Sequence, residues 1–125
     1  MPEQSSFDYA LIRVVPRVEK EEFVNAGVVV FCLEKNFLEA RVRIEDERLR
    51  ALWPEIDVEL VRQHLEAVVK IASGAADGGP IAKLSIRERF HWLVAPRSTM
   101  IQLSPVHTGI CVNPAASLDH LFNTL

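Results

Sequence analysis

The chain has 125 residues, a mass of 14.1 kDa and a formal net charge of −3, from 14 Lys and Arg against 17 Asp and Glu. Its 49% apolar and 25% charged residues are close to the averages of a soluble globular domain. No apolar run approaches the ~20 residues of a membrane span, and the first residues lack the pattern of a signal peptide. We therefore expect a single cytoplasmic domain with no membrane association. The acidic balance makes nucleic-acid binding unlikely as a default function.

The first third of the chain predicts three strands. Residues 7–16 are rich in aromatic and β-branched side chains, and Pro16 ends this run because it removes a backbone donor. Residues 26–33 form a second apolar strand, and residues 38–44 alternate between apolar and charged side chains, as in a half-exposed strand. Short links between consecutive strands favour an antiparallel meander.

Helical signals begin at Glu45 and end first at Trp53-Pro54. A longer helix is predicted from a cap at Asp57 to about Ser73, because apolar residues recur there at spacings of three and four. The glycine-rich segment 74–80 is predicted to be a loop.

The C-terminal part continues with a helix over residues 85–95, with Ser85 as its cap, and a strand over residues 99–104. Residues 106–113 fit either a loop or a short edge strand. Pro114 begins a C-terminal amphipathic helix. Together these elements predict one α+β domain over residues 1–125, in which helices cover an antiparallel sheet of about four strands.

Two blocks of the chain have a specific pattern. The first is Tyr9-x-x-x-Arg13-x-x-Pro16 followed by Glu22-Phe23-Val24-Asn25-x-Gly27-Val28, and the second is Pro96-Arg97-Ser98-Thr99-x-Ile101-Gln102-x-Ser104-Pro105. With these blocks the chain resembles, over nearly its whole length, an uncharacterised bacterial family that is a domain of unknown function. Members of such a family are sometimes encoded beside kinases similar to the HipA-like toxin kinases. The resemblance thus implies a kinase-like protein partner and no known activity.

Arg13 stands out in the first strand, because a guanidinium among apolar neighbours needs hydrogen-bonding partners. A hairpin centred near residue 20 places Arg13 opposite Gly27, which leaves space for the arginine side chain. We therefore predict a structural network of Arg13 with Glu22 or Asn25, with a role in a binding site as the alternative. The segment from Asn25 to Gly27 favours a tight turn over a phosphate-binding loop, because a strand follows it.

Other side chains are candidates for binding a ligand or partner. Arg97 and Ser98 follow a proline and suit a small anion or a phosphorylated partner. Gln102 either bonds across the sheet or lines a groove with Arg13. His107 is the best candidate for proton transfer, since histidine titrates near neutral pH, and we expect it to neighbour Arg97. No nucleophile or carboxylate is placed beside it by the sequence, so no catalytic residue is assigned.

The remaining patterns favour structural roles. The four histidines are scattered, and Cys32 and Cys111 are far apart in sequence, so we predict no metal site and no cofactor. Both cysteines are expected to be inert buried thiols. The basic and aromatic residues between 83 and 97 fit a helix with an apolar face and solvated arginines better than a nucleic-acid surface.

Two functional hypotheses follow. The first is a non-enzymatic protein-interaction or regulatory module, with a kinase-like protein as its partner. The second is a small enzyme or binding domain for an anionic ligand that uses Arg13, Arg97 and His107. Convergence of these three side chains in one cleft would favour the second hypothesis. The sequence gives no indication of the oligomeric state.

Overall fold

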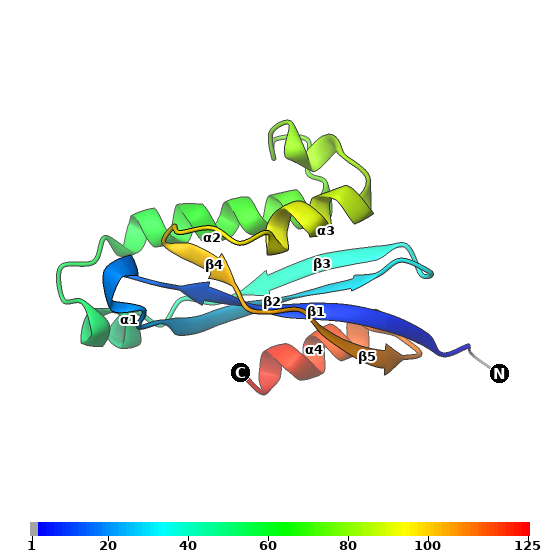
Figure 1. Cartoon of the computed structure of the whole chain (residues 1–125), viewed down its shortest axis with the longest axis horizontal. Coiled ribbons are helices and arrows are strands. Elements are labelled where there is room, and N and C mark those ends of the chain that lie inside the picture. The colour runs from blue at the N-terminus through cyan, green and yellow to red at the C-terminus, as the bar shows by residue number, and fades with distance from the viewer. Residues whose placement is uncertain (1–2) are drawn as a thin grey trace.

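An antiparallel sheet lies between two helical layers (Figure 1), as a computed structural model of residues 3–125 shows. Its five strands are β1 (Ser5–Val14), β2 (Val24–Cys32), β3 (Phe37–Val42), β4 (Ile101–Leu103) and β5 (His107–Cys111). The first three form the predicted meander, in the order β3-β2-β1, and β4 and β5 both pair with the other side of β1. The predicted α+β class is therefore confirmed, and residues 106–113 contain an edge strand rather than only a loop.

Ser104 connects β4 to β5 without breaking the hydrogen bonding of β1. Its backbone N–H donates to the Leu11 carbonyl over 2.9 Å, while its hydroxyl oxygen accepts from the Leu11 N–H over 2.8 Å. The hydroxyl group also donates to the Pro105 carbonyl. Because the side chain replaces the backbone acceptor that the chain lacks at this point, β1 stays fully paired while its partner chain bends.

The helices form where the sequence predicts them. They are α1 (Asp46–Leu52), α2 (Val58–Ser73), α3 (Ile86–Val94) and α4 (Pro114–Asn123), with two short 3₁₀ turns, η1 (Val18–Lys20) and η2 (Ile81–Lys83). The predicted caps are confirmed: Asp57 accepts from the Leu60 N–H, and Ser85 accepts from the Glu88 N–H. Within residues 3–125, no helix is both long enough and apolar enough to cross a membrane.

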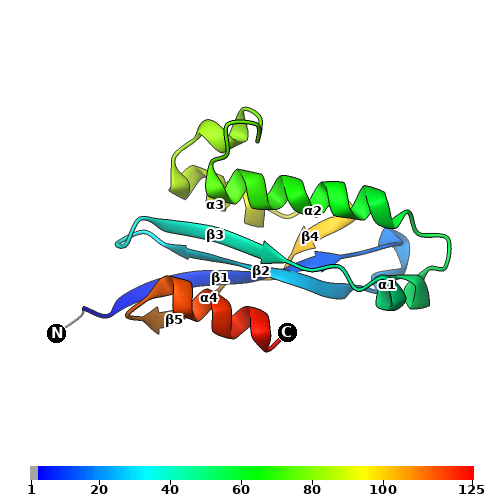
Figure 2. The ribbon, with the colours of Figure 1, turned by 180° about the vertical axis from the view of Figure 1, so that it is seen from behind.

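The helices α2 and α4 cover opposite faces of the sheet (Figures 1 and 2). We call the face under α2 and α3 the helix-pair face. Val61 and Leu65 of α2 are almost fully buried there, and Phe90 of α3 stacks on Phe31 of β2 with ring centroids 4.7 Å apart. The other face, which we call the α4 face, has a smaller buried cluster that contains Leu118.

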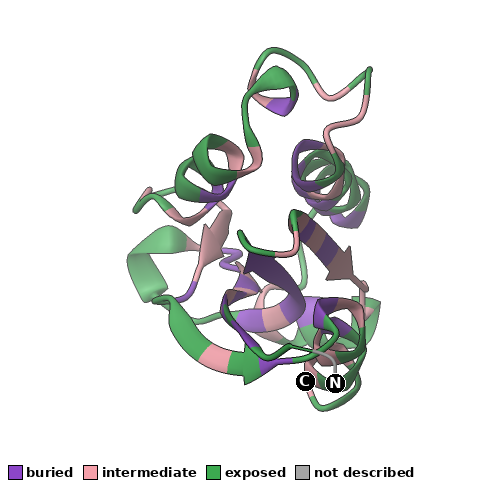
Figure 3. Cartoon of the chain, turned by 90° about the vertical axis from the view of Figure 1, so that its right-hand side faces the viewer, coloured by how far each residue is buried: buried purple, intermediate pink, exposed green. Residues whose placement is uncertain are grey.

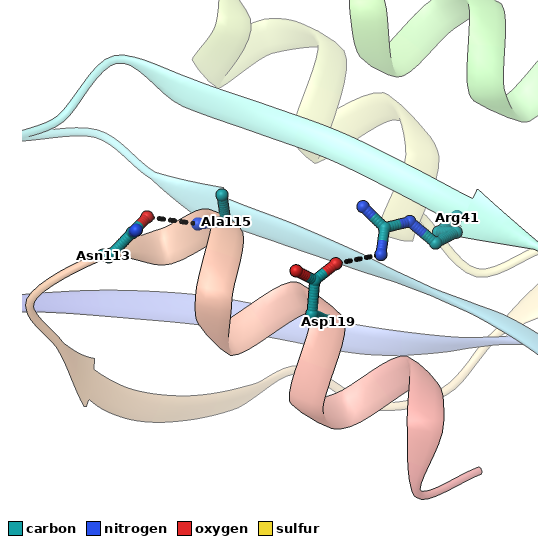
Figure 4. A network of polar contacts seen from close by, with 4 residues as sticks. All are labelled: Arg41, Asn113, Ala115 and Asp119. Atoms are coloured by element: carbon teal, nitrogen blue, oxygen red, sulfur yellow. Dashed lines mark hydrogen bonds and ion pairs between the residues drawn. The ribbon is translucent and has the colours of Figure 1, made fainter.

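Two polar contacts position α4 (Figure 4). The Asn113 side chain caps the helix by accepting from the Ala115 N–H over 3.0 Å, and Asp119 pairs with Arg41 of β3. The helix therefore packs along β2 and β3. On β1, by contrast, Tyr9, Leu11 and Arg13 stay only half-buried.

The pairing of β1 with β2 differs from the prediction. Ile12, not Arg13, lies opposite Gly27, and Arg13 lies opposite Asn25, because a bulge leaves Ala26 without an opposite residue. The space beside Gly27 is not free for an arginine side chain either, since a Cβ atom there would meet the Arg41 carbonyl and the Val42 side chain of β3. Gly27 thus permits the close approach of β3.

The predicted turn from Asn25 to Gly27 is also wrong. Both residues lie inside β2, and their φ angles are not positive. The positive φ that this connection requires falls earlier, at Glu21, which ends the η1 turn with φ 57°. The reversal of the chain is therefore complete before the apolar strand begins.

Candidate functional site

The Arg13 pocket is an open hollow of about 330 Å³ beside the C-terminal end of β1. Its lining comes from four parts of the fold: the end of β1, the η1 turn, the residue before β2 and the segment around β4. The lining residues are Arg13, Val15, Val18, Glu21, Phe23, Ser98 and Gln102. Three of these, Arg13, Ser98 and Gln102, are among the side chains that the sequence singles out.

Strand pairing places the polar side chains of this pocket. Arg13 is on the α4 face because side chains alternate along a strand, and Tyr9 and Leu11 lie on the same side. Gln102 of β4 is the direct neighbour of Arg13 on one side, and Asn25 of β2 is its neighbour on the other. The sequence left two alternatives open for Gln102, and the structure places it beside Arg13 in the same hollow.

The Arg13 side chain lies on an aromatic ring. Its guanidinium carbon is 4.2 Å from the centroid of Phe23, within the range of a cation–π contact. Its Nε atom is buried without a hydrogen-bond partner, and the Asn25 Oδ1 atom is also buried without one. Among residues 3–125, no ion pair includes Arg13. Neither of the two predicted bonds of Arg13, to Glu22 or to Asn25, is present in residues 3–125, and the guanidinium lies on the Phe23 ring instead.

Arg97 has a different environment. Its guanidinium lies 4.3 Å above the Trp92 ring, and it donates to the Trp92 and Ala95 carbonyls. It lines a separate, mainly apolar pocket of about 230 Å³ between α2, α3 and β4, whose lining also includes His64. This pocket belongs to the helix-pair face, away from Arg13.

His107 lies on the α4 face, where its ring is 5.3 Å from that of Tyr9, its partner on β1. Arg97 lies on the other face, so the predicted neighbourhood of His107 and Arg97 is wrong. Along β1, Tyr9 and Arg13 are four residues apart, which corresponds to about 13 Å in a strand. The structure therefore brings Ser98 and Gln102 to Arg13, and it does not bring Arg13, Arg97 and His107 into one cleft.

The cysteines lie on the α4 face. Cys32 and Cys111 are both buried and unoxidised, as expected. Burial, followed by the neighbouring Cys32, raises the pKa of the Cys111 thiol. A raised pKa disfavours the reactive thiolate. In the described part of the chain, residues 3–125, no group of three or more metal-ligating side chains is close enough to hold an ion.

Sequence reasoning missed four of the seven residues that line the Arg13 pocket, namely Val15, Val18, Glu21 and Phe23. The last three come from the connector between the first two strands, where the sequence assigns a role only to Glu22. The signal that could have found them is Phe23 itself. A large apolar side chain that follows a run of charged residues is expected to pack on another part of the protein, and Phe23 packs on the Arg13 guanidinium.

A second notable surface is the outer edge of β5, which we define as residues Val106–Val112. Ile110 is 64% exposed, Val112 44% and Val106 42%. Figure 3 shows this strand as mostly exposed, with Gly109 intermediate and Cys111 buried. It contains none of the charged residues that usually prevent edge strands from pairing.

The backbone groups on this edge are identified by alternation. Leu11 uses its N–H and C=O toward the β4 side of β1, so Tyr9, two residues before it, uses its own toward β5. Its partner His107 therefore faces β1. The N–H and C=O groups of Thr108 and Ile110 consequently point away from the sheet.

The chain is thus a small α+β domain with two candidate binding surfaces, the Arg13 pocket and the outer edge of β5. Both lie on the side of the sheet where β4 and β5 pair with β1. The chain belongs to the family described as "Protein of unknown function (DUF3037)", whose model matches residues 9–125. This confirms the resemblance to a domain of unknown function. No curated protein and no solved structure matches the chain.

Proposed function

We propose that this protein is a non-enzymatic interaction module of the bacterial cytoplasm, which binds an extended segment of a partner protein as an additional strand beside β5. The observation that carries this proposal is the uncovered edge of β5. It offers unpaired backbone groups at Thr108 and Ile110 together with exposed apolar side chains. Strand addition uses such a combination, since main-chain hydrogen bonds give affinity and alternate side chains give specificity.

The chemistry of the edge defines the occupant. Residues 106–112 carry no formal charge when His107 is neutral, so a charged segment gains nothing there, whereas an apolar segment covers Ile110 and Val112. The kinase-like protein that the family resemblance implies is the first partner to test. The separation of Arg13, Arg97 and His107 further supports binding over catalysis, because the enzyme hypothesis needs these groups in one cleft.

The first experiment compares three variants with the wild type in binding to the co-expressed kinase-like protein. Ile110→Lys places a charge on the edge, and Ile110→Pro removes the outward N–H without touching the hydrogen bonds to β1. Leu33→Lys is the matched control, because Leu33 is an exposed apolar residue, 46% accessible, outside the edge. We expect both Ile110 variants to weaken binding roughly tenfold or more, and Leu33→Lys to bind like the wild type.

Amide hydrogen exchange then identifies the mode of binding. On addition of the partner, the Thr108 and Ile110 amides should become protected, because they are the ones that a new strand would bond. Unchanged exchange at these amides, or equal binding by Ile110→Lys, would contradict the proposal. So would a concentration-dependent dimer of the protein alone that Ile110→Lys dissociates, since the edge would then serve a second copy of this chain.

A further inference from the structure

We infer that the Arg13 pocket is a binding site for a small apolar ligand that carries a carboxylate and an ammonium group, the chemistry of an apolar amino acid. This site is separate from the β5 edge and does not depend on the proposed function. The inference rests on three features of the pocket: a guanidinium without an anionic partner, polar groups that are already held in place, and a lining that combines one positive charge, one carboxylate and apolar side chains.

The first feature is the state of Arg13. A guanidinium has five N–H donors in a planar fork that matches a carboxylate. Arginines that only stabilise a fold usually direct this fork at carbonyls or carboxylates, as Arg41 does with Asp119. In residues 3–125, Arg13 has no ion pair, and its Nε is buried without a partner. Such a group is costly to leave unsatisfied, so a ligand anion would gain from it.

The second feature is the way the fork is held. Phe23 supports one face of the guanidinium at 4.2 Å, which fixes its plane and leaves its edge available. Gln102 is held as well, because its Nε2 donates to the Thr99 carbonyl over 2.9 Å. The amide oxygen of Gln102 is then free to accept from a ligand, and the Ser98 hydroxyl lies in the same lining. The polar groups are thus positioned before a ligand arrives.

The third feature selects the class of anion. The lining contains a single positive charge, from Arg13, and Glu21 adds a negative one. A phosphate dianion would meet one arginine and one carboxylate, whereas a monocarboxylate matches the arginine alone. The carboxylate of Glu21 in turn suits an ammonium group on the same ligand. Val15, Val18 and Phe23 supply apolar surface for its body.

The test uses three probes that share the same branched apolar chain and differ in their charged groups. Leucine has both groups, 4-methylpentanoate lacks the ammonium, and 3-methylbutylamine lacks the carboxylate. Each is titrated into ¹⁵N-labelled protein, and the Nε–H resonance of Arg13 reports binding. We expect leucine to bind with a dissociation constant in the millimolar range, because the pocket is open. 4-Methylpentanoate should bind more weakly than leucine, and 3-methylbutylamine should give no saturable shift.

Variants separate the contributions. Arg13→Lys keeps the positive charge but loses the planar arrangement of N–H donors. It should lower the affinity for leucine at least fivefold, as measured from the backbone resonances of β1 and β4. Glu21→Gln should lower the affinity for leucine to that for 4-methylpentanoate and leave the latter unchanged. Arg97→Met is the matched control, because Arg97 also lies on an aromatic ring but binds backbone carbonyls, and it should bind leucine like the wild type.

Several results would overturn the inference. One is the absence of any shift at Arg13 with leucine up to its solubility limit. Another is unchanged leucine affinity in Arg13→Lys. Inorganic phosphate that binds more tightly than leucine would show that the site prefers a different anion. The Ile110→Lys variant should still bind leucine, so a failure of the β5 proposal is distinguishable from a failure of this one.

Discussion

Arg13 and Arg97 lie on opposite faces of the sheet, and each places its guanidinium on an aromatic ring, at 4.2 Å and 4.3 Å. Their hydrogen bonding is nevertheless different. Arg97 follows the end of α3, where the last carbonyls of the helix have no partner within the helix and can accept from it. Arg13 lies in the middle of a sheet, where neighbouring strands already use the carbonyls.

This difference shows that the same pair of residue types can stabilise a helix end in one place and remain available to a ligand in another. The difference depends on whether unpaired main-chain carbonyls lie within hydrogen-bond distance of the guanidinium. The two faces also differ in their packing, since the helix-pair face has the larger buried cluster and the α4 face the smaller one. The predictions below test these contrasts, beginning with the packing.

The largest effect is expected from Leu65→Ala on the helix-pair face. Leu65 is 1% exposed and lies between α2 and the sheet, so its truncation leaves a cavity in the larger cluster. The free energy of unfolding should fall by about 2–5 kcal/mol, as measured by urea denaturation. A loss below about 0.5 kcal/mol would show that this face of α2 does not carry the core.

A smaller loss is expected from Leu118→Ala on the α4 face. Leu118 is fully buried as well, but α4 is the last helix of the chain and can shift to fill part of the cavity. The loss should lie near the lower end of the same range, about 2 kcal/mol. If the same denaturation experiment gave a larger loss than for Leu65→Ala, the ranking of the two faces would be reversed.

The arginines themselves provide a sharper contrast. Arg97→Met removes hydrogen bonds to the Trp92 and Ala95 carbonyls, so it should destabilise the protein by about 1 kcal/mol. Arg13→Met removes a half-buried charge without partners and keeps a long apolar side chain over Phe23. Its unfolding free energy should stay within about 0.5 kcal/mol of the wild type.

Thermal and urea unfolding of the two methionine variants measure this contrast. Equal losses would mean that Arg13 is a structural residue after all, with partners in solution that stabilise the fold. In that case the network predicted from the sequence would regain support, and the ligand inference would lose it.

The smallest effect concerns the ion pair of Lys70 and Asp77, 2.8 Å apart at the end of α2 and outside both pockets. The Lys70 ammonium donates a hydrogen bond to the Asp77 carboxylate, and this bond, followed by the charge of Lys70, lowers the pKa of Asp77. The same bond, followed by the charge of Asp77, raises the pKa of Lys70. The stabilisation is therefore present at neutral pH. It is lost as the pH falls through the lowered pKa of Asp77, and as the pH rises through the raised pKa of Lys70.

Because both side chains are largely exposed, the stabilisation should be small and sensitive to salt. Asp77→Asn should unfold slightly more easily than the wild type at pH 7. At a pH below the titration of Asp77, the two proteins should become equally stable. A difference that persists at acid pH would assign the effect of the substitution to something other than this ion pair.

The helices were predictable because their signals are local. Asp57 and Ser85 cap the helices that follow them, and the residues of α2 that recur at spacings of three and four are the buried ones. The alternation in residues 38–44 likewise predicts which side of β3 is inside. Each of these signals depends on neighbours within a few residues, so one chain suffices to read them.

The candidate sites were predictable only in part. Arg13, Ser98 and Gln102 were recognised one by one as unusual residues, but their meeting depends on the pairing of β1 with β4, across almost 90 positions of sequence. The register at Gly27 differs by one residue from the predicted hairpin, and the bulge at Ala26 adds a second, so Arg13 lies opposite Asn25. No local pattern announces either shift.

The sequence by itself determined the α+β class, the meander and the capped helices, because propensity, periodicity and capping act over short distances. Only the tertiary structure decided that β4 and β5 pair with the same side of β1 and that α4 leaves Arg13 half-buried. It also decided that Arg97 donates to two carbonyls, whereas the Arg13 Nε has no hydrogen-bond partner. The physical reason is that hydrogen-bond satisfaction is a property of the whole neighbourhood, which distant segments create together.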